Sequence, residues 1–136
     1  MASATTGYLV FRVGRECYGI GVDSVIEVLH LVALNEIPGS DILGVMTLRN
    51  RTLKVFDLRH RFGLPDVRFS LTTPIIAVST PQGAIGLVVD ETDDVIQVAH
   101  EDVLPYSSNG VEGSFRMEGR TILIMDMGQF VTEKRA

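Results

Sequence analysis

The residues of this sequence best suited to metal binding or covalent chemistry are three histidines and one cysteine. His30, His60 and His100 stand far apart, and none has a second ligand at a spacing such as i, i+4. Cys17 has no neighbouring histidine or aspartate to activate its thiol, so we interpret it as a packing residue of a strand. A site assembled from distant residues stays open at this point, but the sequence predicts neither a metal site nor a cofactor.

Carboxylates supply two further candidates. One is a run of four acidic residues that lacks the alternating ligands and distal glutamate of a calcium loop, and we interpret it as a solvated turn between strands: Asp90, Glu91, Asp93 and Asp94. The other is the pair Asp57 and Asp126, which would be a catalytic dyad only if the fold brought them together. Because the two occupy equivalent places in two similar segments, helix capping explains both more simply.

Other catalytic motifs are missing from the sequence. The pair Gly19-x-Gly21 lacks the third glycine of a dinucleotide-binding loop and precedes strand-forming residues rather than a helix. No Gly-x-Ser-x-Gly nucleophile elbow occurs. We therefore expect a protein that is not an enzyme and acts through exposed edges and apolar patches. A small barrel enzyme with a site assembled across the chain is the remote alternative.

Composition and charge favour one folded unit in a reducing compartment. The chain is 46% hydrophobic, with a formal net charge of −5, and an acidic chain repels phosphate backbones and anionic lipids. We therefore expect neither nucleic-acid binding nor membrane insertion. A single cysteine, with no visible signal peptide, predicts a cytoplasmic protein. Six basic residues form either a solvated face or a positive patch for an acidic partner: Arg49, Arg51, Lys54, Arg59, Arg61 and Arg68.

The sequence also repeats itself, with an offset of about 67 to 70 residues. The matching pairs keep their order: 19–23 with 86–90, 25–28 with 95–98, 37–38 with 104–105, and 51–58 with 120–127. This period is too long for a stacked solenoid. The repeat instead predicts two similar lobes related by a pseudo-twofold axis.

Each half is expected to be mainly β. Strands are predicted over 8–13, 17–22, 25–28, 75–78 and 84–89, from their β-forming residues and flanking turns. Tight turns are predicted at 49–51 and 117–119, because Asn and Gly accept positive φ. Asp57 should cap a short helix over 58–62, and Asp126 one over 127–131. A turn at Asp23-Ser24 should precede the strand that begins at Val25.

These elements predict a mostly β fold of two small five-stranded barrels, with one or two short helices. We expect one domain over residues 7–131, made of a first lobe near 7–69 and a second near 70–131. Residues 1–6 and 132–136 are expected to be flexible tails.

Several stretches resemble the CheW-like family of chemotaxis coupling proteins. The resemblance runs over residues 8–20, 44–50, 55–64, 86–95 and 122–126, in the family's order. It implies the CheW-like fold of two Src-homology-3-like barrels, in which the first strand can belong to the second barrel. It also implies an adaptor that couples the cytoplasmic tip of a chemoreceptor, a methyl-accepting chemotaxis protein, to the regulatory domain of a CheA-type histidine kinase.

The resemblance assigns binding roles to particular residues. Receptor contact falls on Arg49, Gly44, Val25, Glu27 and Val28, and kinase contact on Val95 and Val98. Each has a structural alternative: Arg49 could merely flank a hairpin turn, Glu27 could be an ordinary strand residue, Gly44 could serve backbone geometry, and the valines could be core residues.

Three departures from the family pattern leave the partner set open. Thr47 stands in the place of an asparagine, Asn50 in that of a glycine, and Lys54 in that of a common proline. An accessory protein that binds only the receptor or only the kinase, in a specialised chemosensory pathway, is therefore the alternative function.

Overall fold

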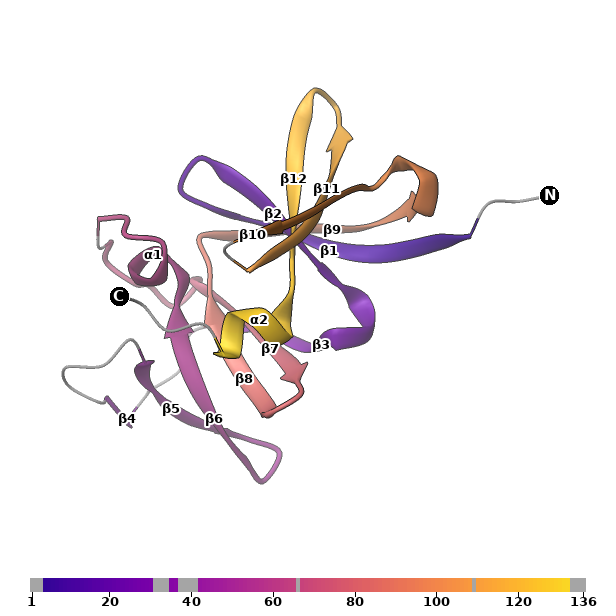
Figure 1. The fold of residues 1–136 in the computed structure, drawn as a ribbon. Helices are drawn as coiled ribbons and strands as arrows, with labels where there is room; N and C mark the ends of the chain where they lie inside the picture. The colour runs from indigo at the N-terminus through magenta and orange to yellow at the C-terminus, as the bar shows by residue number, and fades with distance from the viewer. Residues whose placement is uncertain (1–3, 31–34, 37–41, 66, 109, 133–136) are drawn as a thin grey trace.

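Two six-stranded sheets make up most of the protein in the computed structural model, which describes residues 4–30, 35–36, 42–65, 67–108 and 110–132 (Figure 1). The first runs in the order β3-β7-β8-β6-β5-β4 and the second β10-β11-β12-β2-β1-β9. We name them the first and second barrel. The strands are β1 (Thr5–Val13), β2 (Glu16–Gly21), β3 (Val25–His30), β4 (Asn35–Glu36), β5 (Ile42–Leu48), β6 (Arg51–Asp57), β7 (Pro74–Thr80), β8 (Gly83–Val88), β9 (Glu91–Ala99), β10 (Leu104–Ser108), β11 (Val111–Met117) and β12 (Arg120–Met125).

The two halves of the sequence exchange their opening hairpins. Strands β1 and β2 pair with β9 and β12 of the second half, and β7 and β8 pair with β3 and β6 of the first. The exchange expected for the first strand thus involves a whole hairpin and is mirrored by a second one. Neither barrel is made of one continuous segment, so the boundaries 7–69 and 70–131 do not separate the sheets.

The exchanged hairpins join their sheets through parallel pairs in matching register. Ile124 of β12 pairs with Gly19 of β2, and Val55 of β6 pairs with Gly86 of β8. Both glycines come from the repeated Gly-x-Gly and Gly-x-x-Val segments, so the repeat in the sequence is a repeat in three dimensions. This confirms the predicted mostly β, two-barrel fold.

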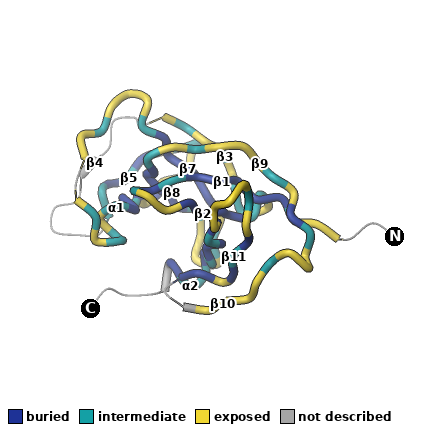
Figure 2. The backbone as a smooth tube through the Cα atoms, turned by 90° about the horizontal axis from the view of Figure 1, so that it is seen from above, coloured by how far each residue is buried: buried dark blue, intermediate teal, exposed yellow. Residues whose placement is uncertain are grey.

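The buried apolar side chains form three clusters, one inside each barrel and one between the barrels. One cluster fills the first barrel, with Leu53, Val55 and Ile75 at its centre. Another fills the second barrel, around Val10 and Ile122. The third and largest lies between the barrels and draws from both: Leu9, Phe11, Val13, Tyr18, Ile20, Leu58, Ile76, Val78, Ile85, Leu87, Val89, Met125, Met127 and Phe130. Figure 2 shows β1, β7 and β8 as mostly buried strands at the centre of the molecule.

Helices and turns form where the sequence predicts them. The helix α1 (Leu58–Arg61) begins after Asp57, whose Oδ1 accepts a hydrogen bond of 3.0 Å from the amide of Arg59. At α2 (Met127–Thr132), Oδ1 of Asp126 accepts from the amide of Gln129 at 3.1 Å. A 3₁₀ turn over Val22–Ser24 precedes β3, and a second one over His100–Asp102 lies between β9 and β10. None of the described helices is long and apolar enough to span a membrane.

Both predicted two-residue hairpin turns have left-handed backbones. Arg49 and Asn50 have φ of 49° and 67°, and Glu118 and Gly119 have 50° and 77°. Positive φ at both central positions matches the twist of the flanking strands. The hairpins β5–β6 and β11–β12 are therefore closed in the same way.

Three local expectations were wrong. Each sheet has six strands rather than five, because β4 and β10 are short edge strands in segments whose prolines argue against a strand. Thr5 and Thr6 are not a flexible tail but part of β1, paired with β9; residues 1–3 and 133–136 lie outside the described residues. Of the acidic run, only Asp90 lies between strands; Glu91, Asp93 and Asp94 belong to β9, and Glu91 faces Arg12 across the β1–β9 pair.

Candidate functional site

The residues expected to bind a receptor lie around the end of the first barrel, where β3 meets the β5–β6 turn. A guanidinium nitrogen of Arg49 lies 3.0 Å from Oε1 of Glu27. Glu27 lies on β3, at one end of the strand order, and Arg49 lies in the turn between β5 and β6, so this ion pair joins segments of one sheet that are not neighbours in that order. The Arg49 side chain is 76% exposed, and Glu27 is partly buried. Most of the arginine therefore stays available to a partner.

The other three predicted receptor residues differ in what they present. A register shift between Val25 and Glu27 places Val25 opposite Val78 of β7, and Val25 packs against the cluster between the barrels. Val28 points away from the side of β3 that carries Glu27 and is exposed. Gly44 is buried within β5, paired with Val55. Arg49 and Glu27 are thus brought together, whereas Val28 belongs to a different surface.

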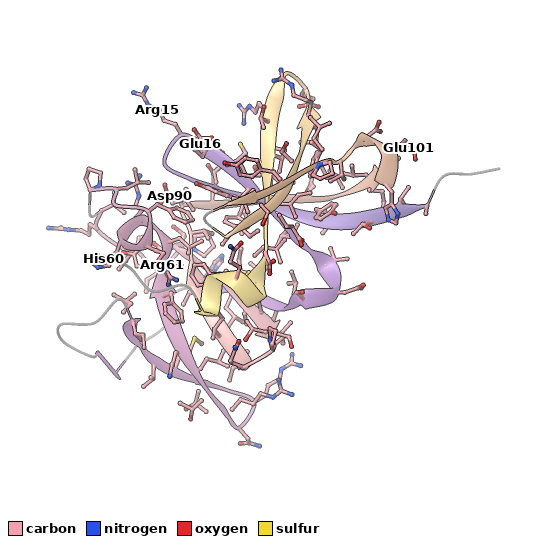
Figure 3. The ribbon with its side chains drawn as sticks, viewed as in Figure 1. Arg15, Glu16, His60, Arg61, Asp90 and Glu101 are labelled. Atoms are coloured by element: carbon pink, nitrogen blue, oxygen red, sulfur yellow. The ribbon has the colours of Figure 1, made fainter. Side chains whose placement is uncertain are left out.

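The predicted positive patch is only partly a surface feature. Arg59 and Arg61 turn inward: Arg59 pairs with Asp90, and Arg61 lies over the ring of Phe130 at 4.2 Å and donates a 2.6 Å hydrogen bond to the carbonyl oxygen of Phe130. Figure 3 labels Arg61 and places it between α1 and α2. The four other basic residues are exposed: Arg49, Arg51, Lys54 and Arg68.

The equivalent place in the second barrel is a groove of about 880 Å³ between β9 and β11. Its apolar lining includes Ile96, Val98, Leu104 and Met117. Val98 is 8% exposed and forms part of the floor, while Leu104 on the rim is 62% exposed. Val95 is exposed on β9 but does not line the groove.

Of the residues that line this groove, Val98 alone was predicted from the sequence to bind a partner. Leu104 and Met117 belong to β10 and β11, and only the curling of the sheet brings them opposite β9. The repeat offers one signal in retrospect: the positions equivalent to Glu27 and Arg49 are Gln97 and Glu118. These two side chains cannot form the ion pair found in the first barrel.

Charges around the groove differ from those around the Arg49 end. Glu101 and Asp102 line one side and Arg116 the other. The hairpin turn contributes Glu118, where the first barrel has Arg49. The two barrel ends thus have the same backbone but opposite charge at the turn.

The described residues show no convergent catalytic group. No cluster of three or more His, Cys, Asp or Glu side chains suited to a metal ion occurs among them. His60 and Glu101 lie on opposite sides of the molecule in Figure 3. Asp57 and Asp126 cap separate helices, and Cys17 is buried within the second barrel.

The altered pKa values arise mainly from burial. Burial, with a contribution from Glu16, raises the pKa of Tyr18 to about 12. Burial also raises the pKa of Tyr8 and of Glu112, and a nearby carboxylate adds to each: Glu112 for Tyr8, and Asp126 for Glu112. All three shifts favour the uncharged form, as expected for groups held near a core.

Two small barrels around a shared core, with an exposed charged end on one and an apolar groove on the other, define a protein-binding module rather than an enzyme. The family model described as CheW-like domain matches residues 7–135. The chain therefore belongs to the CheW-like family.

Related proteins agree with this assignment. The chain is 31% identical to the chemotaxis protein CheW of Klebsiella aerogenes over 77% of this chain and 66% of the relative, just under two thirds of its length. It is 34% identical to CheW of Bacillus subtilis over 76% of this chain and 67% of the relative. The chemotaxis protein CheA of Treponema pallidum is 32% identical over 90% of this chain and 16% of its own length.

A solved structure has the same fold along nearly the whole chain. The crystal structure of the scaffolding protein TtCheW from Thermoanaerobacter tengcongensis superposes with a TM-score of 0.86 at 27% identity. The match covers 96% of this chain and 95% of that one. Hairpin exchange and shared core thus belong to an arrangement found in a solved scaffolding protein.

Proposed function

We propose that this protein is a chemotaxis-type coupling adaptor, which holds the cytoplasmic tip of a chemoreceptor and a CheA-type histidine kinase together. The observation that carries the proposal is membership of the CheW-like family over residues 7–135. The presence of two different candidate surfaces, one on each barrel, supports it further. The adaptor works in the cytoplasm and uses neither catalysis nor a cofactor.

The receptor surface is the Arg49 end of the first barrel. Arg49 offers an exposed guanidinium at the hairpin turn, within 3.0 Å of the Glu27 carboxylate. A guanidinium held in one orientation can bind a carboxylate of the receptor with two parallel hydrogen bonds. Arg51 and Lys54 are exposed on the same hairpin and add positive charge that favours an acidic receptor surface.

The kinase surface is the groove of the second barrel. Apolar side chains line it between charged ones, and the exposed Leu104 is placed to fill a pocket of the partner. A few well-packed side chains near the centre of an interface contribute most of its binding energy. A segment of the Treponema pallidum CheA is itself similar to this chain, so a barrel of the kinase is the partner we expect.

Pulldown of a purified receptor tip and of CheA by the immobilised protein tests the proposal. Wild type should retain both partners, and Arg49→Ala should lose most of the receptor while keeping CheA. Arg116→Ala, at the groove of the other barrel, is the matched control and should keep the receptor. Equal receptor retention by wild type and Arg49→Ala would remove the assignment of Arg49, and retention of neither partner by wild type would remove the function itself.

A further inference from the structure

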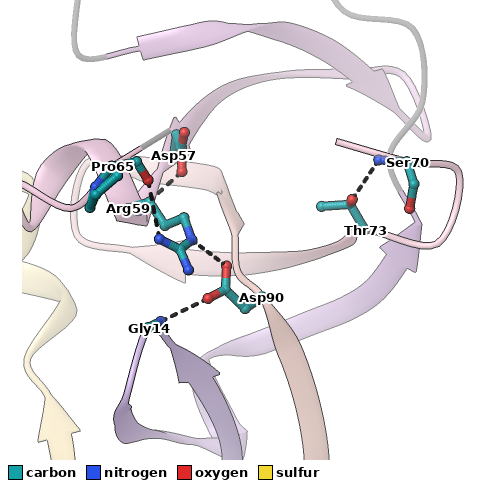
Figure 4. A network of polar contacts seen from close by, with 7 residues as sticks. All are labelled: Gly14, Asp57, Arg59, Pro65, Ser70, Thr73 and Asp90. Carbon is teal, nitrogen blue, oxygen red and sulfur yellow. Dashed lines mark hydrogen bonds and ion pairs between the residues drawn. The ribbon is translucent and has the colours of Figure 1, made fainter. Parts of the chain in front are cut away.

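A polar junction around Asp90 connects the two barrels at one end of their interface (Figure 4). Asp90 lies where the chain passes from β8 of the first barrel to β9 of the second. Its Oδ1 accepts a 2.9 Å hydrogen bond from Nε of Arg59, and its Oδ2 accepts one of 2.7 Å from the amide of Gly14. The Asp90 carboxylate thereby joins α1, which follows β6 of the first barrel, to the β1–β2 turn of the second barrel.

Backbone contacts hold both charged residues in place. The amide of Asp90 donates to the carbonyl oxygen of Arg12 at 3.0 Å. A terminal nitrogen of Arg59 donates to the carbonyl oxygen of Pro65 at 3.1 Å. The side chains of Arg59 and Asp90 are 18% and 27% exposed. Solvent therefore screens this pair less than it screens a surface ion pair.

Close packing of side chains also joins the two barrels at this junction. Gly14 has a φ of +64°, and a Cβ atom at this position would lie 2.9 Å from Cδ1 of Leu64. The turn of the second barrel is thus seated closely against the segment that follows α1. Next to it, the ring of Phe62 stacks on Tyr18 of β2 with centroids 5.1 Å apart.

The residues related to this junction by the pseudo-twofold axis are of different types and cannot form the same contacts. By the sequence repeat, the positions equivalent to Asp90, Arg59 and Gly14 are Asp23, Gly128 and Pro81. Glycine has no guanidinium, and proline has no amide hydrogen to donate. A Cβ on Gly128 would lie 3.4 Å from Oδ1 of Asp126 and 3.6 Å from Cγ of Pro81, so Gly128 and Pro81 are neighbours but cannot reproduce the Arg59–Asp90–Gly14 contacts.

We infer that Arg59 and Asp90 are positioning residues that fix the relative orientation of the two barrels. The effect of this orientation on binding rests on the proposed function. If receptor and kinase bind different barrels, the angle between the barrels determines whether both partners can be held at once. Loss of the junction should leave each barrel folded and each single partner bound. It should weaken the three-component complex, by roughly tenfold, within the usual range of coupling between two sites.

Residual dipolar couplings of the backbone amides test the inference without any partner. In wild type, one alignment tensor should describe both barrels, and in Arg59→Gln the tensors of the two barrels should differ. Arg12→Gln is the matched control, because Arg12 forms ion pairs with Glu91 and Asp93 inside the second barrel. A single shared tensor in a folded Arg59→Gln variant would overturn the inference.

Two further measurements keep the test decisive. If Arg59→Gln does not fold, Gly14→Ala is used in its place, because it keeps both charges but strains the turn, whose φ at this position is +64°, and crowds Leu64. Titrations with receptor tip alone, CheA alone and both together then separate the two claims. Failure of wild type to bind either partner contradicts the proposed function, whereas an unchanged three-component affinity in a variant with divergent tensors contradicts only the consequence drawn here.

Discussion

Arg49 and Glu27 form an ion pair of 3.0 Å that connects the β5–β6 turn to β3 of the same sheet. Their equivalents in the second barrel, Glu118 and Gln97, cannot form such a pair, and a groove lies at the equivalent place instead. The two copies of one motif therefore differ at this place: one has an ion pair with an exposed arginine, and the other has a groove with several apolar lining residues. This contrast gives the two barrels different binding chemistry on the same backbone.

Exchanging the two charges separates the structural role of Arg49 from its role in binding. The double variant Glu27→Arg with Arg49→Glu can form the same ion pair in the opposite sense, so its free energy of unfolding should stay within about 1 kcal/mol of wild type. Receptor binding should still fall sharply, because the exposed charge now has the wrong sign. Chemical denaturation and receptor titration measure the two effects. Receptor affinity restored along with the ion pair would mean that Arg49 acts only within the barrel.

Kinase binding should depend on Leu104 because its exposed side chain lies on the rim of the groove. We expect Leu104→Ser to reduce CheA affinity by roughly tenfold or more, the size of effect seen at central apolar contacts. Its stability should barely change, since the side chain is 62% exposed. Isothermal titration of CheA into the variant measures the loss.

Leu71 provides the control for Leu104. It is 85% exposed and lies in the segment between α1 and β7, outside the groove. Leu71→Ser therefore removes a similar apolar side chain from a different surface and should leave CheA affinity unchanged. Equal losses in the two variants would point to a general effect of surface hydrophobicity and would contradict the groove as the kinase surface.

The sequence repeat predicted the two-lobed fold, and local residue types predicted both helix caps and both turns with positive φ. The exchange of hairpins could not be predicted in the same way. Gly19 and Gly86 lie in equivalent strands, and their local pattern is the same whether a hairpin pairs with its own half or with the other. Only the packing of both hairpins into the shared core distinguishes the two arrangements.

The candidate site was predicted less completely than the fold. Arg49 and Glu27 were named from the family resemblance, but their ion pair depends on the curling of the sheet. The resemblance suggested Val98, which lines the groove, but Leu104 follows a 3₁₀ turn and precedes a proline, a context that does not indicate a strand. Asp90 was grouped with its acidic neighbours, although its partner Arg59 is distant in sequence. Long-range pairing of this kind leaves no periodic signal.

The parallel junctions predict unequal tolerance of two equivalent glycines. A Cβ on Gly86 would lie 3.2 Å from Cγ2 atoms of both Ile75 and Val55, which are completely buried. We expect Gly86→Ala to cost about 1–3 kcal/mol, the usual penalty for overpacking a core. At Gly19 the closest atoms would be Cγ2 of Ile122 at 3.4 Å and Cβ of Tyr8 at 3.5 Å, so Gly19→Ala should cost less. Urea denaturation of both variants measures the difference, and a greater loss at Gly19 would contradict the packing described.

Tyr18 should make the stability of the protein depend on pH in the alkaline range. Burial raises its pKa to about 12, above the ordinary value of 10.0. A group whose pKa is higher in the folded state contributes stability that is fully present below pH 10 and is lost as pH rises towards 12. Each pKa unit corresponds to about 1.4 kcal/mol, so the difference between 10.0 and about 12 corresponds to about 3 kcal/mol at most. Tyr18→Phe cannot ionise and should lose less stability than wild type between pH 10 and pH 12. Urea denaturation of both proteins across this range, at constant ionic strength, would disprove the assignment if the two stability profiles ran parallel.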